Sequence, residues 1–485
     1  MSGFNWTPTG VDLAFKILFN GSDNFLVYFD PDVDGLFSGY LACRVLDALG
    51  KKYDKYINAN RAHGFLMSED EIKALAGRTV IAVDFSITQD KLLLLQKYKV
   101  KLINIDHHAI SSDKLIYWGT ADSPEGVVIN NQYCFEPAEH RYLSGAGVVF
   151  YTFANMFSWF DTNLTRALVG ITLLSDVRPI ENEFARVFLS ACYNSRDSYI
   201  LYLVKRTNSG KDYGFGVPYM ERSYIDFTFN PKMNALLRMN RGYEAIDILF
   251  GSGEDIDLDS VRQSQNIIRD NIISKLKPVY SSQKLAILCC PPFQISNQYD
   301  TANFVGLTCS KIKGDANKSV ITYMGTDKKI LKGSFRGAYD IDYLSLFQSS
   351  LNCAGHVNAF GILETDISQV DFDMLNNSLT ELESRVGAAQ MKNRLIPVDN
   401  MSLFIHTDLL KQVAMANNYV REQNRIYLKY TGTAIAATHR GKMIEYTLDN
   451  IKVKCFDESL NPSNAYILPI YDRRALSFYL KPAQI

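Results

Sequence analysis

Acidic and imidazole side chains recur in the first part of the chain, each shortly after an apolar run. The set is Asp30, Asp32, Asp34, Asp84, Asp106, His107, His108 and Asp176. Carboxylates that lie close together repel one another unless cations neutralise them. If these residues meet in space, a cluster of divalent metal ions is the simplest explanation. The chemistry that we expect from such a cluster is metal-assisted hydrolysis.

The types of ligand narrow the choice of metal. Carboxylates with one or two imidazoles and no cysteine favour Mn²⁺ or Mg²⁺ over structural zinc. Two such ions bridged by a carboxylate, about 3.5–4 Å apart, generate hydroxide at neutral pH and stabilise an in-line displacement at phosphorus. Each residue alone also fits an ordinary role, such as a helix N-cap or a buried histidine pair. Their repeated occurrence favours the metal site.

The elements that must position these residues are predicted to be buried strands. The runs are 25–29, 79–83, 100–105 and 168–174. Parallel strands bring their carboxyl ends to one edge of a sheet, where open α/β folds bind ligands. Helices are expected from Leu36 to Gly50, from Gln89 to Tyr98, and from about Gly145. Gly35 would allow the sharp strand-to-helix turn.

Two segments further along carry groups suited to phosphate. Lys332–Arg336 ends a predicted strand, with Ser334 and Arg336 on one face. A guanidinium beside a hydroxyl suits phosphate capture, although a solvated surface strand has the same pattern. Asn234 and Arg238 are four residues apart, so they share one face of a predicted helix and could contact one phosphate.

A third segment has glycines on both sides of His356. Its sequence is Ala-Gly-His-Val-Asn-Ala-Phe-Gly over residues 354–361. Such glycines let a backbone approach a ligand closely, and Gly355 is expected to begin an anion-binding helix N-terminus. An ordinary glycine turn is the alternative interpretation.

Composition describes a globular protein of more than one domain. The chain has 485 residues, 47% hydrophobic and 21% charged, with a net charge of −1. This excludes a chain coated in basic charge but allows a local basic groove. The eight cysteines show no paired spacing, so reduced thiols and a cytoplasmic location are expected. No apolar run approaches the ~20 residues of a membrane span, and the start lacks a signal pattern.

The predicted architecture is α/β, in four parts. A parallel-sheet domain covers 1–200, and a connecting helical segment with a long helix near Leu258–Leu276 covers 201–280. A smaller α/β domain follows over 281–368. The last part, 369–485, is expected to be β-rich, with a small OB-like barrel as one possibility.

These motifs, taken in order, resemble the DHH phosphoesterase superfamily and, within it, the RecJ-like single-strand exonucleases. The matching pieces are 30–35, Asp84, Asp106-His107-His108, 144–147, 170–176, 332–336 and 355–361. The last two resemble the carboxy-terminal DHHA1-type domain of the superfamily. The spacing Pro231-x-x-Asn-Ala-x-x-Arg238 is similar to the RecJ arrangement.

The resemblance implies a role for each matching residue. It makes Asp84 a bridging ligand of two divalent ions, whose other ligands would be Asp30, Asp32, Asp34, His107 and Asp176. Asp106 would orient an imidazole, and His108 and His356 would face the scissile phosphate. Phosphate contacts would come from Arg61, Asn234, Arg238, Ser334, Arg336 and Gly355. Two departures are Ala354, in place of a glycine, and the absence of Gly-Tyr-Gly after Arg61.

The implied function is a 5′-to-3′ exonuclease on single-stranded DNA, active in repair or recombination. The expected partners are a single strand of nucleic acid, DNA rather than RNA, and single-strand-binding or recombination proteins. The enzyme is expected to be a monomer without a membrane association. One alternative is a phosphodiesterase of oligoribonucleotides or cyclic dinucleotides. Another is a non-catalytic replication or repair scaffold.

Overall fold

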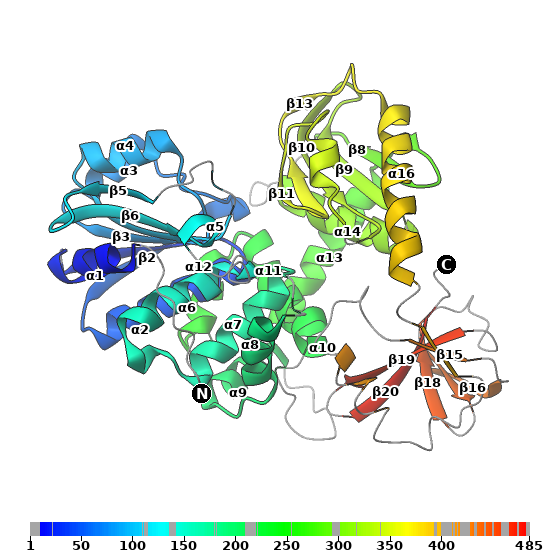
Figure 1. Cartoon of the computed structure of the whole chain (residues 1–485). Coiled ribbons are helices and arrows are strands. Elements are labelled where there is room, and N and C mark those ends of the chain that lie inside the picture. The colour runs from blue at the N-terminus through cyan, green and yellow to red at the C-terminus, as the bar shows by residue number, and fades with distance from the viewer. Residues whose placement is uncertain are drawn as a thin grey trace. The chain divides into compact units, whose positions relative to one another are not determined.

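The computed structural model divides the chain into two compact units, Met1–Gln263 and Ser264–Ile485 (Figure 1). It describes residues 10–391 except 22, 109, 111–114, 135–141, 179, 181, 209–219, 221, 254, 293–300, 317 and 340. Beyond 391 it describes 395–398, 410, 413–414, 416–417, 427–430, 434–440, 443–448, 451–456, 465–472 and 475–481. The predicted boundaries at 200, 280 and 368 stay predictions.

The first unit is built on a six-stranded sheet of order β2-β1-β3-β4-β6-β5. The strands are β1 (Asn24–Phe29), β2 (Lys52–Ile57), β3 (Thr79–Val83), β4 (Lys101–Asp106), β5 (Ile116–Gly119) and β6 (Pro124–Asn130). All neighbours are parallel except β5 and β6. Every residue of β3 is buried, which explains its continuous apolar sequence, because helices cover both faces of a parallel sheet.

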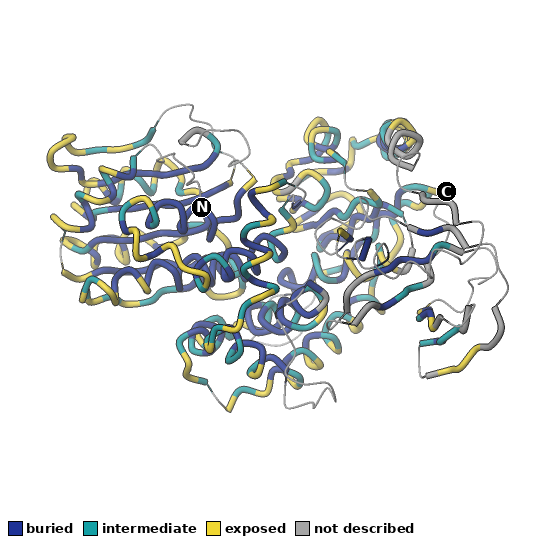
Figure 2. Tube along the Cα trace, turned by 60° about the horizontal axis from the view of Figure 1, so that its bottom comes forward, coloured by how far each residue is buried: buried dark blue, intermediate teal, exposed yellow. Residues whose placement is uncertain are grey.

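Helices pack beside this sheet, and Figure 2 shows the buried parts of the chain in dark blue. They are α1 (Val11–Asn20), α2 (Val33–Ala48), α3 (Glu69–Ala74), α4 (Gln89–Lys97), α5 (Asn131–Cys134), α6 (Gly145–Met156), α7 (Asn163–Ser175) and α8 (Glu183–Tyr193). Asp32 caps α2 and Ser144 caps α6 through side-chain oxygens that accept backbone N–H bonds. The three helices predicted from sequence are therefore confirmed.

One predicted strand is wrong. The apolar run 168–174 lies inside helix α7, so Asp176 follows a helix and not a strand. Thr162 begins α7 with a capping box to Thr165. At Gly170 an added Cβ would lie 2.5 Å from the carbonyl oxygen of Phe188 in α8. This close helix packing buries nearly every side of α7, and a helix buried all round has no amphipathic period to distinguish it from a buried strand.

The rest of the first unit is helical. Its elements are α9 (Ser198–Asn208), α10 (Arg222–Tyr224), a π-helical turn (Ile225–Phe229), α11 (Asn230–Arg238), α12 (Gly242–Leu249) and the start of α13 (Leu258–Ser274). Helix α13 confirms the long helix predicted near Leu258–Leu276. The glycine-rich loop expected between Ser209 and Gly216 lies outside the described residues.

The second unit contains a mixed sheet of order β11-β12-β10-β9-β8-β7, with β13 beside β10. The strands are β7 (Lys277–Ser281), β8 (Leu285–Cys290), β9 (Ser319–Gly325), β10 (Lys329–Arg336), β11 (Cys353–His356), β12 (Ala359–Ile362) and β13 (Thr365–Asp366). Gly355 lies within the β11–β12 hairpin, so the predicted helix N-terminus at this glycine is wrong. Its φ of 136° suits glycine in a strand.

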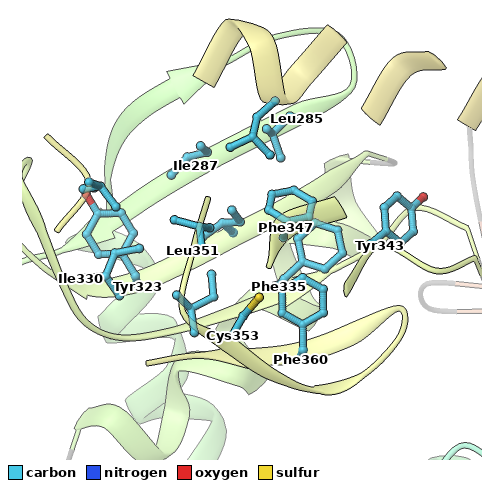
Figure 3. Close-up of a cluster of buried hydrophobic side chains, with 14 of the residues drawn as sticks. Leu285, Ile287, Tyr323, Ile330, Phe335, Tyr343, Phe347, Leu351, Cys353 and Phe360 are labelled. Carbon is cyan, nitrogen blue, oxygen red and sulfur yellow. The ribbon is translucent and has the colours of Figure 1, made fainter. Parts of the chain in front are cut away.

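Two helices cover opposite faces of this sheet. Ala286 packs in a cluster with Cys309 of α14 (Val305–Ala316), whereas Leu285 and its face pack with Leu379 of α16 (Phe372–Met391). Side chains alternate between faces along a strand, so adjacent residues face different helices. Figure 3 shows the α16-side core, where the rings of Phe335 and Phe360 stack with centroids 4.6 Å apart.

The carboxy-terminal part is β-rich, as predicted. Seven strands form one sheet of order β14-β15-β19-β20-β18-β17-β16. Their bounds are β14 (Leu395–Val398), β15 (Tyr427–Tyr430), β16 (Ala434–Arg440), β17 (Met443–Leu448), β18 (Ile451–Cys455), β19 (Ala465–Asp472) and β20 (Ala475–Lys481). An OB-like barrel stays a prediction. Among the helices that the structure describes, none has both the length and the apolar character to cross a membrane.

Candidate metal centre

The turn between β1 and α2 presents three carboxylates with different environments. Asp32 caps α2, because its Oδ1 accepts from the Gly35 N–H at 2.9 Å. Asp34 lies in the first turn of α2 and reaches the N-terminus of α6, where it accepts from the N–H groups of Gly145 at 2.6 Å and Ala146 at 2.9 Å. Gly35 is required here, since an added Cβ would lie 2.5 Å from the Asp30 carbonyl oxygen.

Asp84 follows β3 in a left-handed backbone conformation, with φ of 69°. Its side chain is buried, and Oδ1 has no hydrogen-bond partner among the described residues. The same Oδ1 would lie 2.2 Å from a Cβ added at Gly145. Gly145 therefore leaves the space that the Asp84 carboxylate occupies. A buried anionic oxygen without a donor is costly unless a cation binds it.

His107 turns one nitrogen toward this cluster. Its Nδ1 lies 3.1 Å from the Leu143 carbonyl oxygen, which can only accept, so Nδ1 carries the proton and Nε2 has the lone pair in the neutral ring. That Nε2 is 3.1 Å from Asp84 Oδ1 and 3.9 Å from Asp34 Oδ2. Asp176 completes the group, with Oδ2 3.7 Å from His107 Nδ1. A lone pair that faces carboxylate oxygens is an arrangement suited to a shared cation.

Electrostatics support the same conclusion. Burial and then the negative charges of its neighbours raise the pKa of Asp84 well above its ordinary value. Burial, followed by the charges of Asp176 and Asp32, also raises the pKa of Asp34 well above its ordinary value, against the two N–H donors. Burial lowers the pKa of His107 to about 3, so the ring is neutral at physiological pH. A divalent cation would stabilise the ionised carboxylates and the neutral imidazole together.

Asp106 and His108 form a separate pair beside the cluster. Asp106 Oδ1 accepts from His108 Nδ1 at 2.8 Å, and Asp106 Oδ2 accepts from Ser86 Oγ at 2.6 Å. Burial opposes protonation of His108, but the charge of Asp106 and its hydrogen bond outweigh this and raise the pKa of His108 to about 10. Burial likewise opposes ionisation of Asp106, yet His108 holds the pKa of Asp106 below its ordinary value. Asp106 therefore fixes the orientation of a cationic His108.

Three residues expected at phosphate groups, Arg61, Asn234 and Arg238, lie in the first unit. Arg61 Nε donates to the Pro31 carbonyl oxygen at 3.3 Å, and Arg61 Nη2 lies 3.5 Å from Asn234 Oδ1. Asn234 and Arg238 both belong to α11, as the predicted helix required. The structure thus brings Arg61 and Asn234 together beside the acidic turn.

The other expected phosphate residues lie in the second unit. Arg336 Nη1 donates to Ser334 Oγ at 2.7 Å, and Arg336 Nε donates to Ser310 Oγ at 3.1 Å. Gly306, in the first turn of α14, lies beside both groups, because a Cβ added there would be 3.1 Å from Arg336 Nη2. Gly355 lies in β11 with His356, whose side chain is outside the described residues.

Sequence reasoning missed His63. Its Nδ1 lies 2.5 Å from Asp30 Oδ2, and the Gly64 N–H lies 3.4 Å from Asp30 Oδ1. Burial raises the pKa of Asp30, and His63 only partly offsets this. The sequence did carry a signal, since His63 is two residues from Arg61, but no apolar run precedes it.

Comparisons with known proteins agree with this geometry. The DHH family, N-terminal domain, matches residues 24–175. A single-stranded-DNA-specific exonuclease RecJ from Haemophilus influenzae is 23% identical over 409 residues, which cover 76% of this chain and 68% of that protein.

Solved structures show the same fold. The crystal structure of RecJ in complex with Mn²⁺ from Thermus thermophilus has a TM-score of 0.67 at 17% identity, covering 99% of this chain and 72% of that one. The complex of RecJ with Mg²⁺ from the same organism has a TM-score of 0.62 at 16% identity, covering 99% and 70%. These findings show that residues 24–175 match the DHH family, N-terminal domain, and that the fold of the chain is similar to that of RecJ.

Proposed function

We propose that this protein is a metal-dependent exonuclease that degrades single-stranded DNA from the 5′ end. The observation that carries the proposal is the buried carboxylate Asp84, whose unpartnered Oδ1 lies 3.1 Å from the Nε2 lone pair of His107. The similar protein of Haemophilus influenzae is named a single-stranded-DNA-specific exonuclease, and the similar Thermus RecJ structures are complexes with Mn²⁺ or Mg²⁺. These likenesses support the same activity here.

In this proposal two divalent ions occupy the centre. We define the carboxylate cluster as Asp30, Asp32, Asp34, Asp84 and Asp176. The cluster and His107 would hold the ions, and Asp84 would be the ligand that they share. Ions bound there would supply a hydroxide nucleophile and would stabilise charge on the phosphate. The two N–H groups of the α6 N-terminus hold Asp34 in place, and Leu143 fixes the tautomer of His107.

His108 is the group of the chain best suited to the departing oxygen. Its side chain is 45% exposed, and Asp106 holds it protonated, with a raised pKa of about 10. A positioned imidazolium stabilises negative charge that develops in the transition state. Arg61, Asn234 and Arg238 would contact phosphates of the strand. Ser334, Arg336 and Gly355 would bind its end, with Ser334 and Arg336 on the 5′-terminal phosphate, and His356 would face the scissile phosphate with His108.

The experiment is digestion of single strands labelled at either end, with Mn²⁺ or Mg²⁺ present. Each strand is supplied as DNA and as RNA, with a duplex and a dinucleotide as comparison substrates. A 5′-to-3′ exonuclease releases the 5′ label as a mononucleotide at once and the 3′ label only late. Release of the 3′ label first would contradict the proposal. Turnover of the dinucleotide alone would favour the short-substrate phosphodiesterase, and no turnover at all would favour the scaffold.

A further inference from the structure

The acidic centre contains two ligand groups that share no residue. The ligand atoms of Asp34, His107 and Asp176 lie within 4.8 Å of one another. The ligand atoms of Asp30, Asp32 and His63 do so as well. Asp34 and His107 of the first group are buried and the side chain of Asp176 is 9% exposed, whereas the side chain of His63 is 52% exposed. A third group, Asp84, His107 and His108, shares His107 with the first. The described residues therefore offer an inner set of ligands and, in Asp30, Asp32 and His63, a separate outer set that opens toward solvent.

The loop that carries His63 is held closed by side-chain hydrogen bonds. Asn58 Nδ2 donates to the carbonyl oxygens of Ala62 at 2.7 Å and Gly64 at 2.8 Å. Asn58 Oδ1 accepts from the buried Tyr28 hydroxyl. Because the residues on both sides of His63 are hydrogen-bonded to one buried asparagine, the backbone of His63 is held beside Asp30. Such pre-placement is what a ligand needs.

The charge balance of the outer set calls for a cation. Asp30 is 1% exposed, and its ligand atom lies within 4.8 Å of those of Asp32 and His63. Arg61 supplies one positive charge beside them, because its Nε donates at 3.3 Å to the carbonyl oxygen of Pro31, the residue between the two carboxylates. Two carboxylates and one guanidinium leave a net negative charge. The buried Asp84 Oδ1 has no hydrogen-bond partner among the described residues, so it too would be stabilised by a bound cation.

We propose that Asp30, Asp32 and His63 form an outer cation subsite in which the His63 imidazole is a direct ligand. Asp34, His107 and Asp176 form the inner subsite, and Asp84 lies between the two. The inference rests on the metal centre of the proposed function and adds a ligand to it. Imidazole nitrogen favours transition metals, whereas Mg²⁺ prefers oxygen. His63 thus biases the outer subsite toward Mn²⁺ over Mg²⁺.

The test is a titration of the full chain with Mn²⁺, in which electron paramagnetic resonance measures the free ion. The wild type is expected to bind two ions. His63→Gln should bind one with unchanged affinity and the other about tenfold or more weakly. Mg²⁺ should also compete better for the weakened subsite. His439→Gln is the matched control, because His439 is an exposed residue of β16, and it should bind both ions as the wild type does.

Three results would overturn the inference. One is unchanged binding of both ions by His63→Gln, and another is a single ion in the wild type. The third is full recovery in His63→Asn, which keeps a hydrogen-bond donor near the place of Nδ1 and would make His63 a positioning residue for Asp30. Equal melting temperatures in chelator verify folding of the variants. If the outer subsite behaves as expected but no strand is cleaved, the proposed function fails and the subsite stands.

Discussion

The carboxylate cluster of the first unit and the Ser334–Arg336 face of the second unit differ in how their charge is balanced. In the cluster, Asp34 and Asp84 are buried among other carboxylates, and Asp84 Oδ1 has no donor among the described residues. On the second face, Arg336 is a single cation that already bonds to two hydroxyls and a carbonyl. Buried carboxylates in this arrangement favour a bound cation, whereas the guanidinium of the second face already has hydrogen-bond partners and attracts anions.

Among the variants considered for the two regions, removal of the Asp84 charge should reduce the rate of strand cleavage most. Asp84→Asn retains the left-handed backbone, which asparagine tolerates and alanine does not. We expect strand cleavage to fall by about 10³-fold or more, because several kcal/mol of transition-state stabilisation come from the metal pair. The measurement is single-turnover cleavage. Asp122→Asn is the control, since its side chain is fully exposed, and wild-type rates for Asp84→Asn would rule out a bridging role.

Removal of divalent ions should destabilise the first unit. Ligand at 100 times its Kd adds about 2.7 kcal/mol to stability, so the melting temperature should fall in chelator and recover with Mn²⁺.

The difference in melting temperature between the chelator-treated and the Mn²⁺-bound protein should depend on pH. The pKa values of Asp34 and Asp84 are raised in the folded chain, so their contribution is present below the unfolded value, near 4, and is lost as pH rises. The melting temperature in chelator should therefore fall as pH rises, and the increase in melting temperature on addition of Mn²⁺ should become larger. A recovery independent of pH would argue against metal binding by these carboxylates.

Arg336 should affect one kind of strand end only. A hydrogen bond to a charged group contributes about 1.5–3 kcal/mol, so Arg336→Ala should raise KM for 5′-phosphorylated strands by about 10- to 100-fold. Strands with a 5′-hydroxyl should change little. Arg336→Lys keeps the charge but loses the planar guanidinium that reaches Ser310 and Ser334. Its KM for 5′-phosphorylated strands should lie between the values of the wild type and Arg336→Ala. An equal rise in KM for 5′-phosphorylated and 5′-hydroxyl strands would show that Arg336 does not bind the terminal phosphate.

Ser334 should have the smallest effect. Its hydroxyl accepts from Arg336 at 2.7 Å and lies 3.4 Å from the Phe360 carbonyl oxygen. A neutral hydrogen bond contributes about 1 kcal/mol, so Ser334→Ala should raise KM for 5′-phosphorylated strands by about fivefold. If Ser334→Ala raised KM for 5′-phosphorylated strands more than Arg336→Ala does, the hydroxyl and not the guanidinium would be the main phosphate contact.

Much of the fold and part of the site followed from the sequence. Strands β1, β3 and β4 were predictable because helices cover both sides of them and leave long apolar runs. The meeting of Asp34, Asp84 and His107 then followed from the convergence of parallel strand ends. The starts of α2 and α6 were also predicted to within a few residues, and Asp32 and Ser144 cap them.

The remainder depends on contacts between distant segments. The run before Asp176 is a helix buried on nearly every side, so its apolar residues carry no period that marks it as a helix. His63 reaches Asp30 only because Asn58 closes a loop against Tyr28 of another strand. Gly355 was assigned to a helix start, yet a glycine with positive φ also fits the hairpin in which it lies. The sequence of one segment does not show which other strand it pairs with in a sheet.

The most direct test of the metal centre is anomalous scattering from crystals grown with Mn²⁺. We expect two manganese peaks on either side of the Asp84 carboxylate, about 3.5–4 Å apart, one near His107 and the other near Asp30. Crystals in which manganese is absent from this edge of the sheet, or lies only at exposed carboxylates elsewhere, would contradict it.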